Sequence, residues 1–261
     1  MNLGLDGKRV LVTAASGGLG FATAEALAAE GAEVALCSRD LGRAEAAATR
    51  LSRGGGRARA FRADVSSDAD LQSLFEAVAA DLGGLDILVC NAGGPSPGSF
   101  ESLDEEAWDS AYALTLQSVV RSVRYALPHL RAAGGGRILA IASSSVKRPL
   151  PNLLLSNVFR PAVQGLCKSL SIELAGDNIQ VNCLAPGRIE TERVNQLDRA
   201  LAERRGSSFE AVREQALQAI PMGRLGQPEE FGRVAAFLCS EAALYISGST
   251  VLVDGGAVRS L

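Results

Sequence analysis

Residues 8–20 read Lys-Arg-Val-Leu-Val-Thr-Ala-Ala-Ser-Gly-Gly-Leu-Gly, and this stretch decides the fold. The apolar run 10–12 predicts a buried strand, glycines at 17, 18 and 20 predict a turn without Cβ atoms, and helical periodicity follows from Phe21. A helix that begins after such a turn presents free backbone N–H groups and the positive end of its dipole to an anion. The stretch is typical of a loop that holds a nucleotide pyrophosphate. A glycine turn can also be purely structural, so its assignment depends on the rest of the chain.

Length and composition narrow the class of protein. A chain of 261 residues suits one large α/β domain or two small ones, and we favour a single dinucleotide-binding domain over 1-261. Hydrophobic residues make up 47% and charged residues 21%, as in an ordinary globular enzyme and unlike a disordered chain. The formal net charge of −3 argues against a nucleic-acid-binding surface.

Neither a membrane span nor a targeting segment is predicted. The longest apolar runs, such as 234–239, are too short to cross a bilayer, and Met1 to Leu5 have neither a basic n-region nor an apolar h-region. We therefore expect a soluble cytoplasmic protein with no membrane partner. Five cysteines without a Cys-x-x-Cys pair predict reduced thiols in the core: Cys37, Cys90, Cys167, Cys183 and Cys239.

The residue inventory also limits the chemistry. His129 is the only histidine, so a Ser-His-Asp triad would require it, and its place after Pro128 near an expected helix end favours a structural role. No His/Cys cluster has zinc-ligand spacing, so we expect no catalytic metal.

Apolar strand runs alternate with helical stretches along nearly the whole chain. Strands are expected at 8–13, 33–37, 57–62, 86–90, 136–142, 179–184 and 250–253. Apolar residues recur at three- and four-residue intervals between them, at 18–30, 40–53, 67–81, 104–132, 156–175 and 228–240. Such alternation implies a parallel sheet. We predict an α/β doubly wound Rossmann fold with a seven-stranded parallel sheet and helices on both faces.

The segment 192–222 interrupts this rhythm. It is charged, helix-prone and placed after the carboxyl end of an expected strand, where open α/β sheets bind ligands. We expect it to form a substrate lid. Its arginines either meet an acidic substrate or lie on a solvated helix face, and the second interpretation is favoured: Arg193, Arg199, Arg204 and Arg205.

Several motifs follow the glycine loop in a fixed order. They are Asp64-Val65, Cys90-Asn91-Ala92-Gly93 and Ala185-Pro186-Gly187-Arg188-Ile189-Glu190-Thr191. With the loop at 13–20, they resemble the short-chain dehydrogenase/reductases over nearly the whole chain. The segments 221–230 and 253–256 resemble the 3-oxoacyl-carrier-protein reductase branch of that family. Motifs in this order are far more specific than a glycine loop, and they favour the nucleotide interpretation of it.

The resemblance implies a set of cofactor contacts. The pyrophosphate would be surrounded by Thr13, Ser16, Gly18, Leu19 and Gly20, although Ala14 replaces the usual first glycine. The adenine would be bordered by Asp64 and Val65, and the adenosine ribose and the middle of the cofactor by Asn91, Ala92 and Gly93. The nicotinamide carboxamide would be held by Pro186, Gly187, Ile189 and Thr191. Asp64 can instead be a turn residue and Asn91 a backbone partner at a strand end.

Charge at the end of the second strand indicates the choice of cofactor. Family members that use NAD usually carry a carboxylate near position 38, which bonds the ribose 2′-hydroxyl and repels a 2′-phosphate. This chain has Ser38 and Arg39, a hydroxyl and a guanidinium that can bind phosphate. The pair favours NADP(H) over NAD(H). Alternatively, Arg39 is solvated while Asp40 caps the next helix.

The catalytic positions depart from the family pattern. Ser143 occupies the position of the family's catalytic serine, but Ser156 stands where the tyrosine of the Tyr-x-x-x-Lys pair is expected and Arg160 where its lysine is expected. Thr115 replaces an asparagine found in many relatives. Serine lacks the acidity and reach of a phenol, whereas arginine keeps a positive charge that can hold the nicotinamide ribose.

Pro161 is a second departure, because this pair lies in a long helix in relatives. Proline removes a backbone hydrogen bond, so the helix should kink at 157–161 or begin nearby. Other candidate proton donors have no distinctive spacing, and packing or surface roles are favoured for them: Ser144, Ser145, Lys147 and Tyr112.

Two functions follow from these observations. The first is an NADP(H)-dependent oxidoreductase that interconverts a carbonyl and an alcohol, with Ser143 polarising the substrate oxygen and Arg160 holding the ribose. Ser156, with or without a water, completes the proton path, or the substrate supplies the acid. The second is an NADP-binding regulatory or scaffold protein that kept the fold without the chemistry. The resemblance further implies a homo-oligomer, a tetramer or dimer, formed through 104–132, 156–175 and the C-terminal segment.

Overall fold

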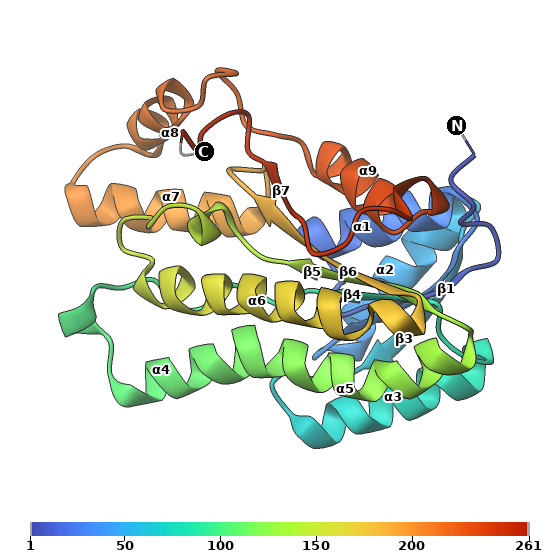
Figure 1. The fold of residues 1–261 in the computed structure, drawn as a ribbon. Coiled ribbons are helices and arrows are strands. Elements are labelled where there is room, and N and C mark those ends of the chain that lie inside the picture. Colours follow the sequence, from blue (N-terminus) through green and yellow to red (C-terminus); the bar gives the residue numbers. More distant parts are fainter. Residues whose placement is uncertain (1, 260–261) are drawn as a thin grey trace.

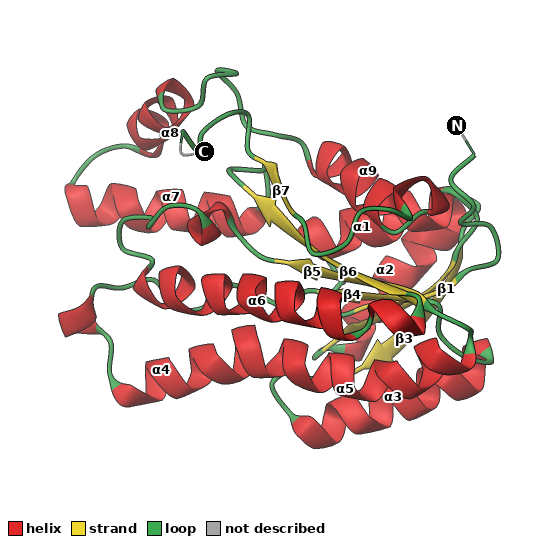
Figure 2. Ribbon diagram, in the orientation of Figure 1, coloured by secondary structure: helices red, strands yellow, loops and turns green. Residues whose placement is uncertain are grey.

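The computed structural model describes residues 2–259; residues 1, 260 and 261 of the expected domain lie outside this range. Seven strands form one parallel sheet in the order β3-β2-β1-β4-β5-β6-β7 (Figures 1 and 2). The strands are β1 (Arg9–Val12), β2 (Glu33–Ser38), β3 (Arg57–Arg62), β4 (Ile87–Cys90), β5 (Gly136–Ile141), β6 (Ile179–Pro186) and β7 (Thr250–Val253). Their order reverses at β1 and β4, which defines the point where such sheets bind ligands.

Helices cover both faces of the sheet (Figure 2). They are α1 (Gly18–Ala29), α2 (Leu41–Arg53), α3 (Asp68–Leu82), α4 (Glu105–Tyr112), α5 (Ser118–Ala132), α6 (Leu154–Glu173), α7 (Glu192–Arg205), α8 (Phe209–Gln218) and α9 (Pro228–Leu238). One apolar cluster joins α1, α2 and α9 to one face, and a second joins α3, α5 and α6 to the other. Alternate strand residues divide between them: Val10 and Val12 lie in the first cluster and Leu11 in the second. The predicted doubly wound fold is confirmed.

The outer boundaries of the elements lie within two residues of the expected ones, and three differences bear on the site. The stretch expected as one helix over 104–132 consists of α4, one π-helical turn at Ala113–Gln117, and α5. Helix α6 begins at Leu154 and continues past Pro161, so it is not broken at 157–161. Strand β6 extends to Pro186, past the expected 184. No helix among residues 2–259 is long and apolar enough to cross a membrane.

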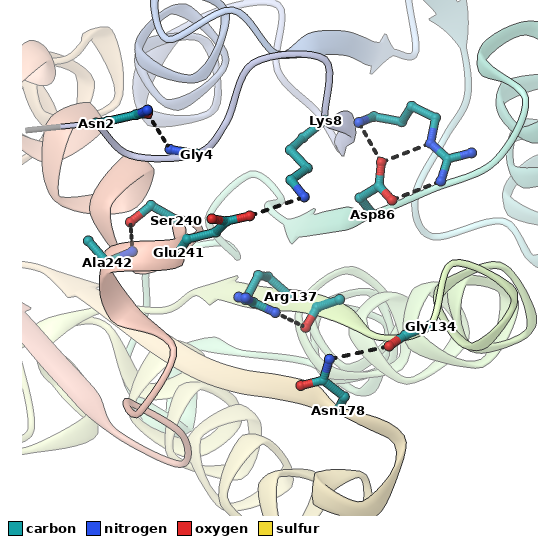
Figure 3. A network of polar contacts seen from close by, with 12 residues as sticks. Asn2, Gly4, Lys8, Asp86, Gly134, Arg137, Asn178, Ser240, Glu241 and Ala242 are labelled. Atoms are coloured by element: carbon teal, nitrogen blue, oxygen red, sulfur yellow. Dashed lines mark hydrogen bonds and ion pairs between the residues drawn. The ribbon is translucent and has the colours of Figure 1, made fainter.

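Polar contacts tie the strands together at their amino ends, opposite the ligand-binding edge (Figure 3). The guanidinium of Arg9, on β1, donates to both carboxylate oxygens of Asp86, just before β4, at 2.8 Å, and the backbone N–H of Arg9 donates to Oδ2 at 2.8 Å. Burial alone would raise the pKa of the Asp86 carboxyl, but these hydrogen bonds and the charge of Arg9 lower it below its usual value.

We expect Asp86→Ala to lower the free energy of unfolding by about 1–3 kcal/mol at neutral pH, because it leaves the half-buried guanidinium of Arg9 unpaired. A carboxyl whose folded-state pKa is depressed stabilises fully above its unfolded-state pKa of about 3.9, and loses this contribution as the pH falls through the folded-state value. Urea unfolding at neutral and acidic pH measures both effects. Asp6→Asn, at an exposed carboxylate, is the control and should leave the curve unchanged; an equal response of both variants would contradict the assignment.

Candidate active site

The carboxyl ends of β1 and β4 are joined by the side chains of Thr13 and Asn91. The Thr13 hydroxyl donates to the Asn91 carbonyl at 2.7 Å and accepts the Asn91 backbone N–H at 2.8 Å. The Asn91 amide Nδ2 donates to the carbonyls of Thr13, at 3.1 Å, and Ala14, at 2.9 Å. These bonds fix the glycine loop against the strand end that bears Asn91, Ala92 and Gly93. Asn91 therefore acts as a backbone partner, as one interpretation of the sequence expected.

The glycine loop forms an open cradle at the start of α1. Gly18 has φ +57°, which favours glycine, and a Cβ on Gly20 would lie 2.4 Å from Asn91 Nδ2. No atoms lie within 4 Å of the Cβ positions of Gly17 and Gly18. The helix has no side-chain cap and no acidic residue in its first turn, so its N–H groups are free to bind an anion. This geometry fits a pyrophosphate.

Ala14 has φ +48°, the left-handed conformation that the usual glycine adopts without strain. We expect Ala14→Gly to raise the free energy of unfolding by about 0.5–1 kcal/mol, because relief of this strain outweighs the greater flexibility of glycine in the unfolded chain. Chemical unfolding measures the change. Ala15→Gly, at a buried residue with ordinary φ, is the matched control and should destabilise. Destabilisation by Ala14→Gly would show that the left-handed conformation carries no strain.

The end of β2 leaves Arg39 exposed and engages Asp40. The Ser16 hydroxyl donates to Ser38 Oγ at 3.2 Å, and Asp40 accepts the Arg43 backbone N–H at 3.1 Å as the N-cap of α2. Arg39 has no ion-pair partner among residues 2–259. The Asp40 carboxylate therefore caps α2, and Ser38 and Arg39 are the groups at this strand end that can bind a phosphate.

The remaining expected cofactor contacts lie at the same edge. Asp64, just past β3, accepts the backbone N–H and the hydroxyl of Ser66, so it is also a turn residue, and Val65 is buried. Gly187 follows β6, where a Cβ would meet Asp254 at 2.6 Å. Ile189 is buried, and Thr191 is the N-cap of α7. The segment 186–191 therefore leads from the sheet directly into the expected lid.

Three serines lie together beyond the end of β5. Ser143 Oγ accepts the Ser145 backbone N–H at 3.1 Å, which leaves the proton of the half-buried Ser143 hydroxyl free to donate to a substrate oxygen. Ser156, in the first turn of α6, places its hydroxyl 3.2 Å from that of Ser145. Ser145 is thus buried and bonded to both predicted catalytic serines, although its spacing in the sequence did not distinguish it. No direct hydrogen bond joins Ser156 to Ser143 in the described part of the chain.

Arg160 lies one helical turn after Ser156, and its side chain is 6% exposed. Nη1 donates to the Ile141 carbonyl at 2.7 Å and Nη2 to the Gly93 carbonyl at 3.4 Å, so the guanidinium joins the ends of β5 and β4. Burial lowers the pKa of Arg160 to about 10; the neighbouring Cys183 thiol opposes this shift, and the charge of Arg193 adds to it. Arg160 therefore stays charged at neutral pH, one helical turn from the candidate catalytic residue Ser156.

A small cavity is lined in part by Arg160. It measures about 10 Å³, the size of one water, and its polar lining consists of Thr13, Asn91, Thr115, Ser118, Ser122 and Arg160. The Thr115 hydroxyl is buried and has no hydrogen-bond partner among the described residues. Thr115 belongs to the π-helical turn, a feature that is frequent at functional sites.

His129 takes no part in this arrangement. It lies in the last turn of α5 and lines a surface groove with Arg9, Gly83 and Gly84, at the amino ends of the strands. His129 therefore lies at the opposite edge of the sheet from Ser143 and cannot form a triad with it, in agreement with its expected structural role. All five cysteines are free and buried, as predicted.

The segment 192–222 contains α7 and α8, and its arginines differ in their surroundings. Arg199, Arg204 and Arg205 are exposed, as expected of a solvated helix face. Arg193 is an exception: its side chain is half-buried and donates to the Pro95 carbonyl at 2.7 Å. Asp198, a buried residue of α7, forms two ion pairs. One is with Arg188, in the segment before α7, and the other is with Arg213, on α8.

Comparisons with known proteins agree with this arrangement. Residues 13–258 match the family model described as enoyl-(acyl carrier protein) reductase. The chain is 36% identical over 259 residues to dehydrogenase/reductase SDR family member 4 of Bos taurus, covering 98% of this chain and 89% of that protein. It is 32% identical over 260 residues to 7alpha-hydroxysteroid dehydrogenase of Escherichia coli, covering 100% and 98%. The crystal structure of L-sorbose reductase from Gluconobacter frateurii, complexed with NADPH and L-sorbose, superimposes with a TM-score of 0.95 at 35% identity and full coverage of both chains.

Proposed function

This chain belongs to the short-chain dehydrogenase/reductase family, and we propose that it is an NADP(H)-dependent oxidoreductase interconverting a carbonyl and an alcohol through an atypical catalytic centre. The observation that carries this proposal is the meeting of three features at one edge of the sheet: the open glycine cradle, the free hydroxyl proton of Ser143 and the buried cation of Arg160. Residues 221–230 resemble 3-oxoacyl-carrier-protein reductases, but this resemblance does not identify the substrate.

The glycine cradle and its neighbours would hold NADP(H), which supplies or accepts a hydride when bound. Free N–H groups at the start of α1 would bind the pyrophosphate, and Ser38 and Arg39 the 2′-phosphate. Asp64 and Val65 would border the adenine, and the segment 186–191 would bind the nicotinamide carboxamide. In the neighbouring structures, L-sorbose reductase is a complex with NADPH and a 7 alpha-hydroxysteroid dehydrogenase is a complex with NADH, so the choice between cofactors depends on this chain's own residues.

The other roles in the reaction fall to side chains of this protein. Ser143 donates a hydrogen bond to the substrate oxygen and polarises it, because its Oγ accepts the Ser145 N–H and its proton is free. Arg160 holds the nicotinamide ribose and stabilises the Gly93 and Ile141 carbonyls. The hydroxyl pair Ser156 and Ser145 forms the proton path, with or without a water, or the substrate itself supplies the acid.

Titration calorimetry with NADPH, followed by NADPH oxidation against a panel of carbonyl compounds, tests the function. Tight binding with turnover on at least one carbonyl supports the oxidoreductase. Tight binding without turnover on any would instead support the regulatory or scaffold protein, for which the specific observation is the loss of the phenol at position 156. Absence of NADPH binding would contradict both functions.

We expect NADPH to bind about ten- to a hundredfold more tightly than NADH, because a charge-assisted phosphate contact contributes about 1.5–3 kcal/mol. Arg39→Ala should remove most of this preference and barely change NADH binding. Arg43→Ala, at an exposed arginine of α2, is the matched control and should keep the preference. Equal affinities of the unmodified protein for both cofactors would reject the role of Arg39.

We also propose that the protein forms a homo-oligomer and works in a reducing compartment. Large apolar side chains are exposed on the elements through which family members are expected to pair: Tyr112 on α4, Val158 and Ile172 on α6, and Tyr245 near the C-terminus. Contact between copies would cover them, as a dimer or tetramer. Five free thiols in the core suit the cytoplasm.

A further inference from the structure

Arg193 occupies a position where a cation is unfavourable. It is the second residue of α7, and the positive end of the helix dipole lies there. Its side chain turns inward over the loop that follows β4: Nη2 donates to the Pro95 carbonyl at 2.7 Å, and Nε and Nη2 lie 3.0 Å from the Cβ position of Gly94. Any larger residue at 94 would displace the guanidinium. The contact therefore depends both on the inward direction of Arg193 and on the absence of a side chain at Gly94.

Arg193 also lacks the carboxylate partner that several neighbouring arginines have. Arg188 and Arg213 pair with Asp198, and Arg199 pairs with Glu192. Within residues 2–259, Arg193 has no carboxylate within ion-pair distance. A half-buried cation held only by a carbonyl retains most of its electrostatic attraction for an anion.

Arg160, on α6, contacts the same loop. It donates to the Gly93 carbonyl, two residues before Pro95, and it too has no carboxylate partner in the described part of the chain. Burial lowers the pKa of both arginines, and the charge of Arg193 lowers that of Arg160 further, so the two cations lie within electrostatic reach. Only the buried Cys183 thiol opposes this among the groups that act on Arg160. The charge at this point is therefore uncompensated.

The position of the pair relative to Ser143 indicates which anion it serves. The cradle for the pyrophosphate lies at β1 and the start of α1, whereas Arg160 bonds the last residue of β5 and Arg193 comes from the segment after β6. Ser143 comes two residues after Ile141, whose carbonyl accepts a hydrogen bond from Arg160. We propose that Arg193, with Arg160 behind it, binds a carboxylate of the substrate, so that the carbonyl compound reduced at Ser143 is an oxo acid. This inference rests on the proposed function and names its substrate class.

Binding to the NADPH complex tests the inference without requiring turnover. After the affinity for NADPH is measured, the change in NADPH fluorescence follows titration with oxo acids in which the carboxylate moves away from the carbonyl one carbon at a time, each beside its methyl ester. We expect at least one acid to bind about tenfold or more tightly than its ester. Arg193→Gln should remove the difference, and Arg193→Lys should keep part of it.

Arg199→Gln, on the exposed side of the same helix, is the matched control and should keep the difference between acid and ester. Equal affinities for every acid and ester, or no acid binding up to the solubility limit, would overturn the inference while leaving the proposed function intact. Weaker NADPH binding by Arg193→Gln without an acid preference would also overturn it and assign the pair to the cofactor phosphates. Failure to bind NADPH would overturn the proposed function and this inference with it.

Discussion

Simple ketones should be reduced about a hundred- to ten-thousandfold more slowly by this protein than by relatives with an intact Tyr-x-x-x-Lys pair, because general acid catalysis contributes about that factor. Ser156 cannot replace a phenol: its hydroxyl is short and weakly acidic, and it is bonded to Ser145 instead of Ser143. Steady-state NADPH oxidation on a ketone panel measures the rate.

The double variant Ser156→Tyr with Arg160→Lys should recover much of this factor. Because α6 is continuous through Pro161, the restored side chains already project one turn apart from the same helix face, and Pro161→Ala serves to test whether a local bend still limits them. Ser156→Phe with Arg160→Lys is the matched control, since it adds the ring without the hydroxyl and should recover nothing. Ser143→Ala should abolish the gain.

Ordinary ketone rates in the unmodified protein, unchanged by Ser156→Ala, would show that another group donates the proton. Ser145 is then the next residue to test, because its hydroxyl is the only one among the described residues that is hydrogen-bonded to Ser156 Oγ. Ser145→Ala would lower the rate in that case, and its backbone N–H would still reach Ser143.

Substitution of Gly20 by alanine should weaken NADPH binding by about ten- to a hundredfold, which corresponds to about 1.4–2.8 kcal/mol. The new Cβ would lie 2.4 Å from Asn91 Nδ2 and 3.0 Å from Ala15 Cα, so the Asn91 amide must move. That movement breaks its bonds to the Thr13 and Ala14 carbonyls, which set the shape of the glycine loop. Calorimetry with NADPH measures the loss.

Gly176→Ala is the control for Gly20→Ala, because nothing lies within 4 Å of its Cβ position and its φ is not left-handed. This variant should bind NADPH as the unmodified protein does. Circular dichroism and chemical unfolding separate a folded Gly20→Ala variant with weak binding from one that fails to fold. Unchanged NADPH affinity in a folded Gly20→Ala variant would show that the loop shape set by Asn91 does not position the cofactor.

The fold follows from local sequence patterns. Apolar runs such as 10–12 and 87–90 are too short and too uniformly hydrophobic to lie anywhere but in a buried parallel sheet, and the helices between them carry apolar residues at helical intervals. The glycine loop was assigned only together with the motifs that follow it, because a glycine turn alone can be purely structural. The candidate catalytic positions Ser143, Ser156 and Arg160 were assigned from the resemblance to the family, because they stand where its motif residues are expected.

Side-chain contacts between segments far apart in the sequence could not be predicted, because they depend on which loops the sheet brings together. Arg193 and Pro95 are 98 residues apart, so nothing in the local pattern of α7 distinguishes an inward arginine from the exposed Arg199. Ser145 has no distinctive spacing, yet burial against α6 makes it the partner of both serines. Short-range periodicity was enough to predict the doubly wound sheet, and the ordered motifs were enough to propose the glycine cradle and the candidate catalytic positions. Two contacts became visible only in the folded structure: the bond between Ser156 and Ser145, and the approach of Arg160 and Arg193 to the loop after β4. Both arise because the carboxyl ends of separate strands come together at one edge of the sheet.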